Sequence, residues 1–120
     1  MANILAVDDS ASMRQMVSFT LKAAGHTVTD AADGKQALDI AKTRSFDLVL
    51  TDVNMPVMDG LTLTRELRAL PAFKFTPVLV LTTEAGMDKK QEGRAAGATG
   101  WLVKPFNPDQ LIATINKVLG

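Results

Sequence analysis

The sequence predicts an α/β fold: a five-stranded parallel sheet with helices on both faces. Five short strand-like runs alternate with five stretches of helical length, and the connections between them are short. Such alternation is typical of parallel strands linked by right-handed crossover helices. Three of the runs are wholly apolar, at residues 4–7, 48–50 and 78–81, and belong inside the sheet. The mixed or short runs at 27–29 and 101–103 belong at its edges, which predicts the flavodoxin-like strand order 2-1-3-4-5.

The first strand, at residues 4–7, is followed by a helix with one apolar face. Its inward positions recur at helical spacing and are Met13, Met16, Val17, Thr20, Leu21 and Ala24. The two methionines are therefore expected to be core residues and not metal ligands. Gly25 ends this helix as a C-terminal cap, and His26 in the turn is expected to be exposed. Residues 27–29 alternate polar and apolar side chains, as a half-exposed second strand does.

The middle of the chain predicts a second and a third helix around the third strand, at residues 48–50. Asp33-Gly34 turns the chain into a helix over residues 35–44, with Ala37, Leu38 and Ala41 inward. Asp59-Gly60 opens the third helix, where the Asp59 side chain can cap exposed amides. Pro71 ends that helix, whose inward residues are Leu63, Leu67 and Leu70.

The last third of the chain predicts two strands and two helices of unequal strength. The strand at residues 78–81 is the most hydrophobic, and the helix at about 87–96 is the weakest because it contains a glycine and little to bury. A short fifth strand occupies residues 101–103. The last helix begins with a cap residue, a proline and a glutamine three residues after the cap, in Asn107-Pro108-Asp109-Gln110. Its expected buried face is Leu111, Ile112, Ile115, Val118 and Leu119.

The composition excludes several classes of function. A chain of 120 residues with 47% hydrophobic and 22% charged residues is expected to fold as one domain, residues 1–120, without an output domain. The chain has no cysteine, so disulfides and thiolate metal sites are excluded. Thirteen basic residues balance thirteen acidic ones without a basic stripe, which disfavours nucleic acid. No apolar run has the roughly 18 to 20 residues of a membrane span, and we expect a cytoplasmic monomer.

Polar, reactive side chains follow the strands of the predicted sheet. Asp8-Asp9 and Asp52 end the first and third strands, between which the strand order reverses and ligands of such sheets bind. Three converging carboxylates repel one another unless a divalent cation neutralises them, and oxygen ligands suit Mg²⁺ or Mn²⁺. Thr82 and Lys104 end the other two strands and can bind phosphoryl oxygens. This set predicts phosphoryl transfer to Asp52, with that carboxylate as nucleophile.

Each of these residues also has an ordinary structural interpretation. A single aspartate after a strand is usually a turn or cap residue, and Asp8-Asp9 can cap the helix that follows. Lys104, before a proline, can be a solvated loop lysine. The functional interpretation depends on all of these residues lying at the same end of one sheet.

Across its whole length the chain resembles the receiver domain of two-component response regulators, and in particular the stand-alone chemotaxis regulators among them. The matching residues are Asp8-Asp9, Asp52, Asn54-Met55-Pro56, Met58-Asp59-Gly60, Thr82, Ala98, Gly100 and Lys104-Pro105-Phe106. The resemblance implies that Asp52 accepts phosphate from a sensor histidine kinase and that the chain is not an enzyme. It also implies an output protein, such as a flagellar motor switch protein, and in some systems a phosphatase.

The resemblance implies further roles for individual residues. Asp8, Asp9, Asp52 and the main-chain carbonyl of Asn54 would surround Mg²⁺. Thr82 and Lys104 would bind the phosphoryl oxygens of the activated state, and the Lys104-Pro105 peptide bond would be cis. Asn54 and Glu84 would tune the rate of dephosphorylation toward a short-lived signal. Trp101 stands where the family usually has a tyrosine or phenylalanine that changes rotamer on activation.

Three alternatives differ in role or chemistry. A phosphate sink or phosphorelay intermediate would use the same site without a motor partner. A small phosphatase of the haloacid-dehalogenase type would need a second aspartate where this chain has Asn54. A flavin-binding electron carrier would need a glycine- and hydroxyl-rich first loop, where this chain has Asp8-Asp9.

Overall fold

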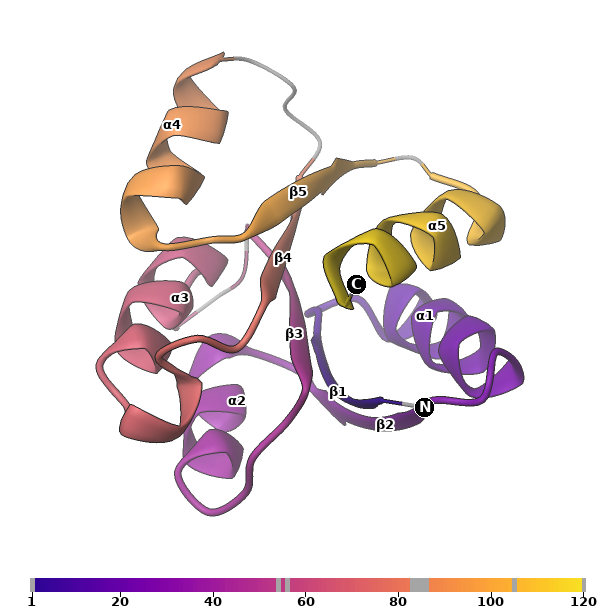
Figure 1. Cartoon of the computed structure of the whole chain (residues 1–120), viewed down its shortest axis with the longest axis horizontal. Helices are drawn as coiled ribbons and strands as arrows, with labels where there is room; N and C mark the ends of the chain where they lie inside the picture. The colour runs from indigo at the N-terminus through magenta and orange to yellow at the C-terminus, as the bar shows by residue number, and fades with distance from the viewer. Residues whose placement is uncertain (1, 54, 56, 83–86, 105, 120) are drawn as a thin grey trace.

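The computed structural model contains a five-stranded, all-parallel sheet in the predicted order β2-β1-β3-β4-β5 (Figure 1). The strands, in chain order, are β1 (Asn3–Val7), β2 (Thr27–Ala31), β3 (Leu48–Asp52), β4 (Val78–Thr82) and β5 (Gly100–Val103). The structure describes residues 2–53, 55, 57–82, 87–104 and 106–119, without the side chains of 87–90 and 93. All five predicted strands are present, and the predicted strand order is confirmed.

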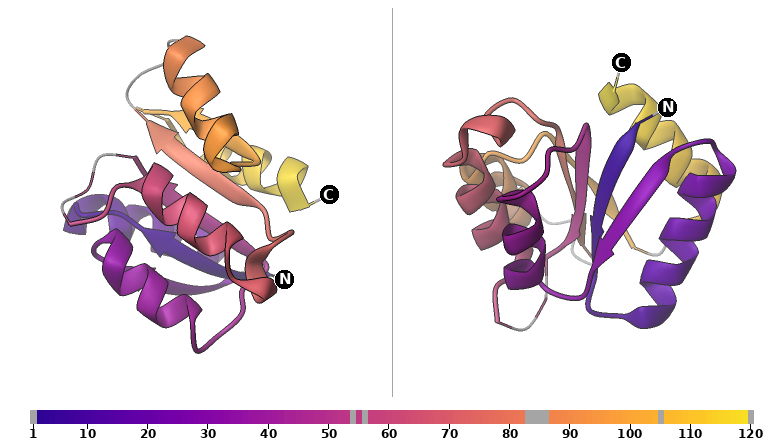
Figure 2. Two further views of the ribbon diagram at one scale, coloured as in Figure 1. Left: turned by 90° about the vertical axis from the view of Figure 1, so that its left-hand side faces the viewer. Right: turned by 90° about the horizontal axis from the view of Figure 1, so that it is seen from below.

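The helices cover both faces of the sheet, as Figure 2 shows from the side and from below. On one face lie α1 (Ala11–Ala23) and α5 (Pro108–Leu119). On the other lie α2 (Gly34–Ala41), α3 (Gly60–Arg68) and α4 (Met87–Ala96). Each face has its own hydrophobic core cluster. A parallel sheet buried on both faces explains why its central strands are wholly apolar in sequence.

Burial separates the central strands from the edge strands as the sequence predicted. All five residues of β3 and of β4 are buried, and four of the five residues of β1. In β2 only Ala31 is buried, and every residue of β5 is half-buried. The strand tips that carry the polar residues therefore belong to the best-packed part of the molecule and to its β5 edge.

Side-chain caps fix where several helices begin. Asp59 accepts a hydrogen bond from the amide of Thr62 at 2.7 Å, which confirms it as the cap of α3. Before α5, the Asn107 side chain accepts from the Gln110 amide at 2.8 Å, and the Gln110 side chain accepts from the Asn107 amide at 2.9 Å. This reciprocal pair is the predicted capping box.

Four local expectations were wrong. The helix expected to run to residue 44 ends at Ala41, because two successive amides after it bond to the Ile40 carbonyl in a tight turn. Ala24 and Leu119 are exposed, since each lies at the end of its helix, beyond the core. His26 is half-buried, and its Nδ1 accepts a hydrogen bond from the Ala2 amide at 3.0 Å.

Between them, the described residues form no helix that is both long and apolar enough to span a membrane.

Candidate functional site

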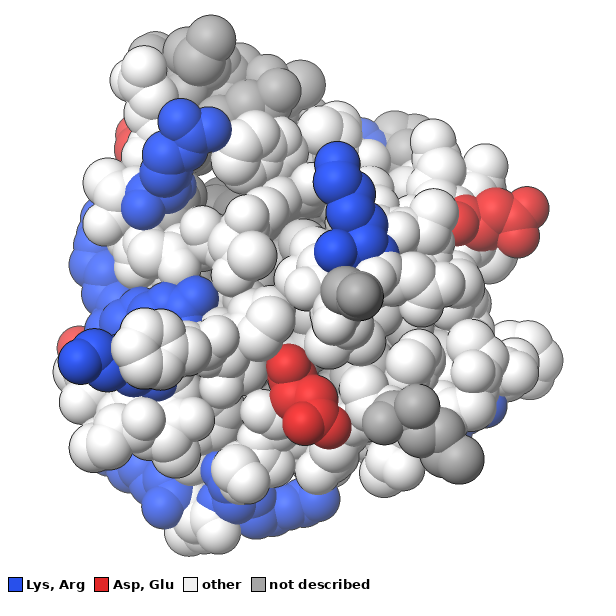
Figure 3. Space-filling view, viewed as in Figure 1, with Lys and Arg blue, Asp and Glu red and all other residues white. Residues whose placement is uncertain are grey.

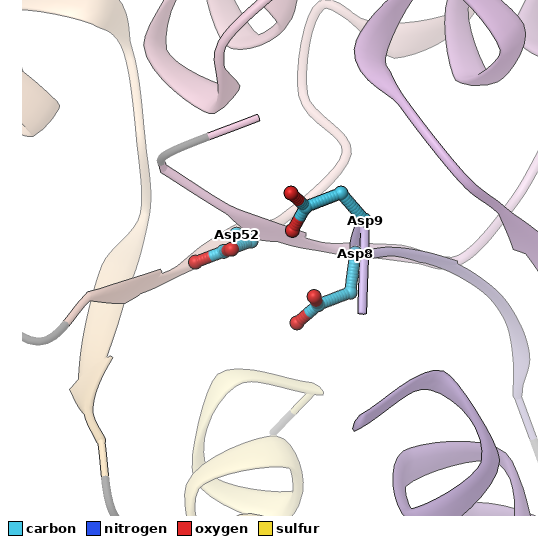
Figure 4. Close-up of side chains that lie close together, drawn as sticks. All are labelled: Asp8, Asp9 and Asp52. Carbon is cyan, nitrogen blue, oxygen red and sulfur yellow. The ribbon is translucent and has the colours of Figure 1, made fainter. Parts of the chain in front are cut away.

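Three carboxylates meet beyond the carboxyl ends of β1 and β3. Asp8 and Asp9 follow the last residue of β1, and Asp52 is the last residue of β3. One oxygen from each lies within 4.8 Å of the others, and Figure 4 shows the three side chains reaching into the same space. The two strands are neighbours in the sheet, and this is the point where the strand order reverses. The convergence that the sequence predicted is therefore present.

The three carboxylates differ in their exposure to solvent. Asp8 and Asp52 are 3% and 7% exposed, while Asp9 is an exposed residue. Burial raises the pKa of Asp52, the positive charge of Lys104 opposes that rise, and the negative charge of Asp8 adds to it. The net result is a raised pKa. A buried carboxylate that is costly to ionise without further positive charge is what a cation-binding site requires.

Lys104 brings a positive charge directly between the two buried carboxylates. Its ammonium donates to Asp8 Oδ2 at 3.2 Å and lies 3.2 Å from Asp52 Oδ1, and its side chain is only 14% exposed. Burial lowers the pKa of Lys104, but the charges of Asp52 and Asp8 outweigh that effect and leave the pKa raised. Lys104 therefore stays charged within the site, and the solvated-loop interpretation of this residue is wrong.

The turn after β1 orients Asp8. The Asp8 Oδ1 atom accepts a hydrogen bond from the Ser10 amide at 2.9 Å, and Ser10 in turn caps α1. Arg14 donates from its guanidinium to the Asp8 main-chain carbonyl at 2.7 Å. Sequence reasoning missed Arg14. One feature of the sequence could have indicated Arg14: it is a basic residue in the first turn of a helix. The helix dipole disfavours positive charge there unless the side chain has another partner.

Close packing beneath β3 fixes the backbone of Asp52. The Val53 amide lies 3.0 Å from both the Asp52 Oδ1 atom and the Leu81 carbonyl, which ties the strand tip to β4. The first residue of α3, Gly60, lies so close that a Cβ atom there would stand 2.0 Å from the Asp52 carbonyl oxygen. Any side chain at position 60 would push α3 away from the site, so this position requires glycine.

Thr82 and Trp101 lie on the strands next to the carboxylates. Thr82, 5% exposed, ends β4 one residue beyond the register partner of Asp52, and its carbonyl accepts from the Lys104 amide at 2.7 Å. Trp101 is half-buried on β5 and pairs in register with Val80. The predicted roles of Asn54 and Glu84 and the predicted cis bond at Lys104-Pro105 lie outside the described residues.

The carboxylate cluster has the chemistry and nearly the dimensions of a divalent-cation site. A Mg²⁺ ion holds its ligands at about 2.0–2.1 Å, so two of its ligands can be at most about 4.2 Å apart. The spread of 4.8 Å or less among the three carboxylates is within a small side-chain rotation of that limit. All donors are hard oxygens, which suit Mg²⁺ or Mn²⁺. The residues present therefore fit such an ion.

The sequence also matches the family model of the response regulator receiver domain over residues 4–116. That match includes every strand tip described above. The chain belongs to the family of response regulator receiver domains.

Several known proteins of similar length are similar to this chain. It is 41% identical over 116 residues to the chemotaxis protein CheY of Pseudomonas aeruginosa, covering 96% of this chain and 94% of that protein. It is 40% identical to the chemotaxis protein CheY-3 of Vibrio cholerae, covering 96% of this chain and 89% of that protein. By contrast, the gliding motility regulatory protein of Myxococcus xanthus is 42% identical over 84% of this chain, which spans only 13% of that protein.

Solved structures agree with this grouping. The chemotaxis response regulator CheY4 of Vibrio cholerae superposes with a TM-score of 0.96 at 57% identity, covering 98% of both chains. The receiver domain of sensor histidine kinase PA1611 from Pseudomonas aeruginosa gives a TM-score of 0.92 at 32% identity, covering 99% of this chain and 98% of that one. That structure is described with a magnesium ion coordinated in its active site cleft.

Proposed function

We propose that this chain is a chemotaxis response regulator that accepts a phosphoryl group on Asp52 from a sensor histidine kinase. The observation that carries the proposal is the placement of the Lys104 ammonium, 3.2 Å from Asp8 and from Asp52, within a three-carboxylate cluster. Membership of the receiver family supports it, as do relatives of matching length that are named chemotaxis proteins. Residues 1–120 act together as one receiver domain in this proposal.

Among the three carboxylates, Asp52 is the best nucleophile. Both oxygens of Asp8 are engaged, Oδ1 by the Ser10 amide and Oδ2 by Lys104. In Asp52 the Oδ1 atom receives the Val53 amide and faces Lys104, and no described residue bonds to Oδ2. That oxygen attacks the phosphorus of a phosphohistidine on the kinase. The new P–O bond forms an acyl phosphate, and the P–N bond breaks with its electron pair left on the imidazole.

Positive charge from two sources allows this reaction. Asp8, Asp9, Asp52 and the main-chain carbonyl of Asn54 would hold Mg²⁺ (or Mn²⁺ in its place). When bound, the ion supplies positive charge to the phosphoryl oxygens and to the acceptor carboxylate. Lys104 supplies the second positive charge and can move from Asp52 Oδ1 to a phosphoryl oxygen over a short distance. With the ion bound, both charges would be in place before the phosphoryl group arrives, so little reorganisation would be needed.

Phosphorylation would be transmitted through the neighbouring strand tips. The Thr82 hydroxyl would donate to a second phosphoryl oxygen, and Trp101 would pack inward in the space that Thr82 vacates. Thr82 and Lys104 are already joined by a 2.7 Å main-chain hydrogen bond, which supports a concerted movement. The surface of α4, β5 and α5 would then change its affinity for an output protein, such as a flagellar motor switch protein.

The experiment that tests this proposal is labelling with acetyl phosphate, a small phosphodonor, followed by intact-protein mass measurement. We expect the wild-type chain to gain one phosphoryl group in Mg²⁺ and to lose labelling in EDTA. Asp52→Asn should abolish labelling, whereas Asp39→Asn, an exposed aspartate of α2, should leave it unchanged. Equal labelling of Asp52→Asn and wild type would refute the assignment. Pull-downs with and without phosphodonor then distinguish a motor signal from a phosphate sink.

A further inference from the structure

A second hollow lies at the start of β5, at the opposite end of this strand from Lys104. It is between the last turn of α4 and the second half of α5. Its volume is about 550 Å³, within the range of roughly 300–1,000 Å³ that is typical of small-molecule sites. Its lining includes Arg94, Thr99, Gly100, Trp101, Lys117 and Val118. None of these residues belongs to the carboxylate cluster, and the proposed phosphorylation chemistry uses only Trp101 among them.

The turn that forms one wall of this hollow is held rigidly. Gly97, after the end of α4, has a φ of 101°, and its carbonyl accepts from Arg68 Nε at 3.0 Å and Nη2 at 2.8 Å. The Thr99 amide donates to the Val78 carbonyl at 2.8 Å, and the Val78 amide donates to Thr99 Oγ1 at 3.0 Å. The hollow is therefore already formed without a ligand, and binding would not need to order this segment.

A missing side chain keeps the hollow open on the α5 side of β5. At Gly100 a Cβ atom would lie 3.2 Å from the side chain of Leu79. Any larger residue at position 100 would press on Leu79 and project into the space beside α5. The half-buried side chain of Val118 is instead available to an apolar part of a ligand.

Two cations border the hollow from opposite sides. Arg94, in the last turn of α4, lies 5.8 Å from the centre of the Trp101 ring, and Lys117 is in the last turn of α5. Neither forms an ion pair with any carboxylate among the described residues. Figure 3 shows blue side chains over α4 and over α5, on either side of the β5 region, without red between them. Helix dipoles account for a basic residue at each helix end, but not for two cations that face one hollow without a carboxylate partner in the described part of the chain.

We propose that this hollow binds a small phosphate monoester that carries a planar ring. The two cations match the charge of about −1.5 to −2 on such a phosphate, and Arg94 can offer it two parallel N–H donors. Thr99 Oγ1 accepts from the Val78 amide, so its own hydroxyl proton is available to a phosphoryl oxygen. Val118 and the Trp101 ring, both half-buried, provide the apolar contact for the ring of the ligand.

The test uses three probes on the unphosphorylated protein in EDTA: AMP, adenosine and inorganic phosphate. AMP carries both the ring and the phosphate, adenosine carries the ring alone, and inorganic phosphate carries the charge alone. Binding is followed by NMR through the Gly100 amide and through the indole of Trp101, the only tryptophan in the chain. We expect AMP to shift both signals saturably and to bind at least tenfold more tightly than either part alone. Binding of AMP no tighter than that of adenosine or phosphate would overturn the proposal.

Matched variants locate the site. Arg94→Gln combined with Lys117→Gln should weaken AMP binding at least tenfold, and both side chains are exposed, so folding should be retained. Lys22→Gln removes a basic residue from the last turn of α1, outside the hollow, and should leave the affinity unchanged. Equal AMP affinity in the double variant and in wild type would also contradict the proposal. Because no phosphodonor or metal is present, these outcomes are independent of whether Asp52 accepts phosphate.

Discussion

Lys104 and Arg68 are two partly buried cations at opposite ends of the sheet, and their surroundings differ in kind. Lys104, beyond the carboxyl ends of the strands, lies 3.2 Å from two buried carboxylates. Arg68, at the end of α3, donates four hydrogen bonds of 2.6–3.0 Å, all to the main-chain carbonyls of Phe73, Thr76 and Gly97. Neighbouring charges leave the pKa of Lys104 raised, whereas burial lowers the pKa of Arg68.

The difference distinguishes a charge that can be redirected from one that cannot. The partners of Lys104 are carboxyl groups whose surrounding charge changes when a metal ion or a phosphoryl group arrives, so the position of Lys104 depends on the state of the site. The partners of Arg68 are carbonyl groups whose charge is fixed. Arg68 therefore joins α3, the segment before β4 and the turn after α4 in every state of the site. Adjustable electrostatics at one end of the sheet are combined with a fixed framework at the other.

The largest expected effect is the loss of stability when Arg68, which holds the fixed framework together, is replaced. Arg68→Met leaves three carbonyls without their donor, and we expect the free energy of unfolding to fall by roughly 2–4 kcal/mol. Arg65→Met, an exposed arginine in the same turn of α3, should change it by less than about 0.5 kcal/mol. Urea unfolding measures both. Equal stability of the two variants would show that Arg68 does not hold this junction, and Asp52 labelling should persist in folded Arg68→Met.

A smaller effect, on the affinity for Mg²⁺, is expected when Lys104 is replaced. Lys104 neutralises the same carboxylates that would bind Mg²⁺, so Lys104→Met should strengthen Mg²⁺ binding by roughly tenfold, about 1.4 kcal/mol. Calorimetric titration with Mg²⁺ measures this, and Lys22→Met serves as a control for the loss of a positive charge elsewhere. If Lys104→Met and Lys22→Met bind Mg²⁺ equally, the ammonium and the ion do not share these carboxylates.

The smallest expected effect concerns the pH dependence of stability. The folded-state pKa of Asp52 is raised above its ordinary value of 3.8, so the folded protein binds the proton more tightly than the unfolded chain does. Stability contributed by Asp52 is then lost as the pH rises from 3.8 through the raised folded value. Without metal at pH 7, Asp52→Asn should therefore be more stable than wild type, which urea unfolding measures.

Two further measurements check the direction of this stability difference. The stability difference between Asp52→Asn and wild type should disappear when unfolding is measured at a pH below 3.8. Saturating Mg²⁺ should stabilise wild type more than Asp52→Asn, because ligands stabilise the form that binds them. A wild-type protein that is the more stable of the two at pH 7 without metal would mean that burial does not dominate the pKa of Asp52.

The sequence predicted the fold and most of the candidate site, because both depend on periodic features. Apolar runs identify the strands, and the residue that follows each run lies at the sheet edge where ligands bind. Arg68 and Arg14 were missed because their partners are main-chain carbonyls, which every residue carries and no sequence pattern marks. The need for glycine at position 60 was missed for a similar reason, because it comes from the approach of two backbones. His26 was assigned to solvent because its partner, the Ala2 amide, is distant in sequence.

The central claim is that Asp52, and neither Asp8 nor Asp9, receives the phosphoryl group. Borohydride reduces an aspartyl phosphate to homoserine, so peptide mass spectrometry after labelling and reduction identifies the acceptor among three carboxylates that lie within 4.8 Å of one another. The account predicts homoserine at position 52 alone, dependent on both acetyl phosphate and Mg²⁺. Homoserine at position 8 or 9, or labelling with an unmodified Asp52, would contradict it.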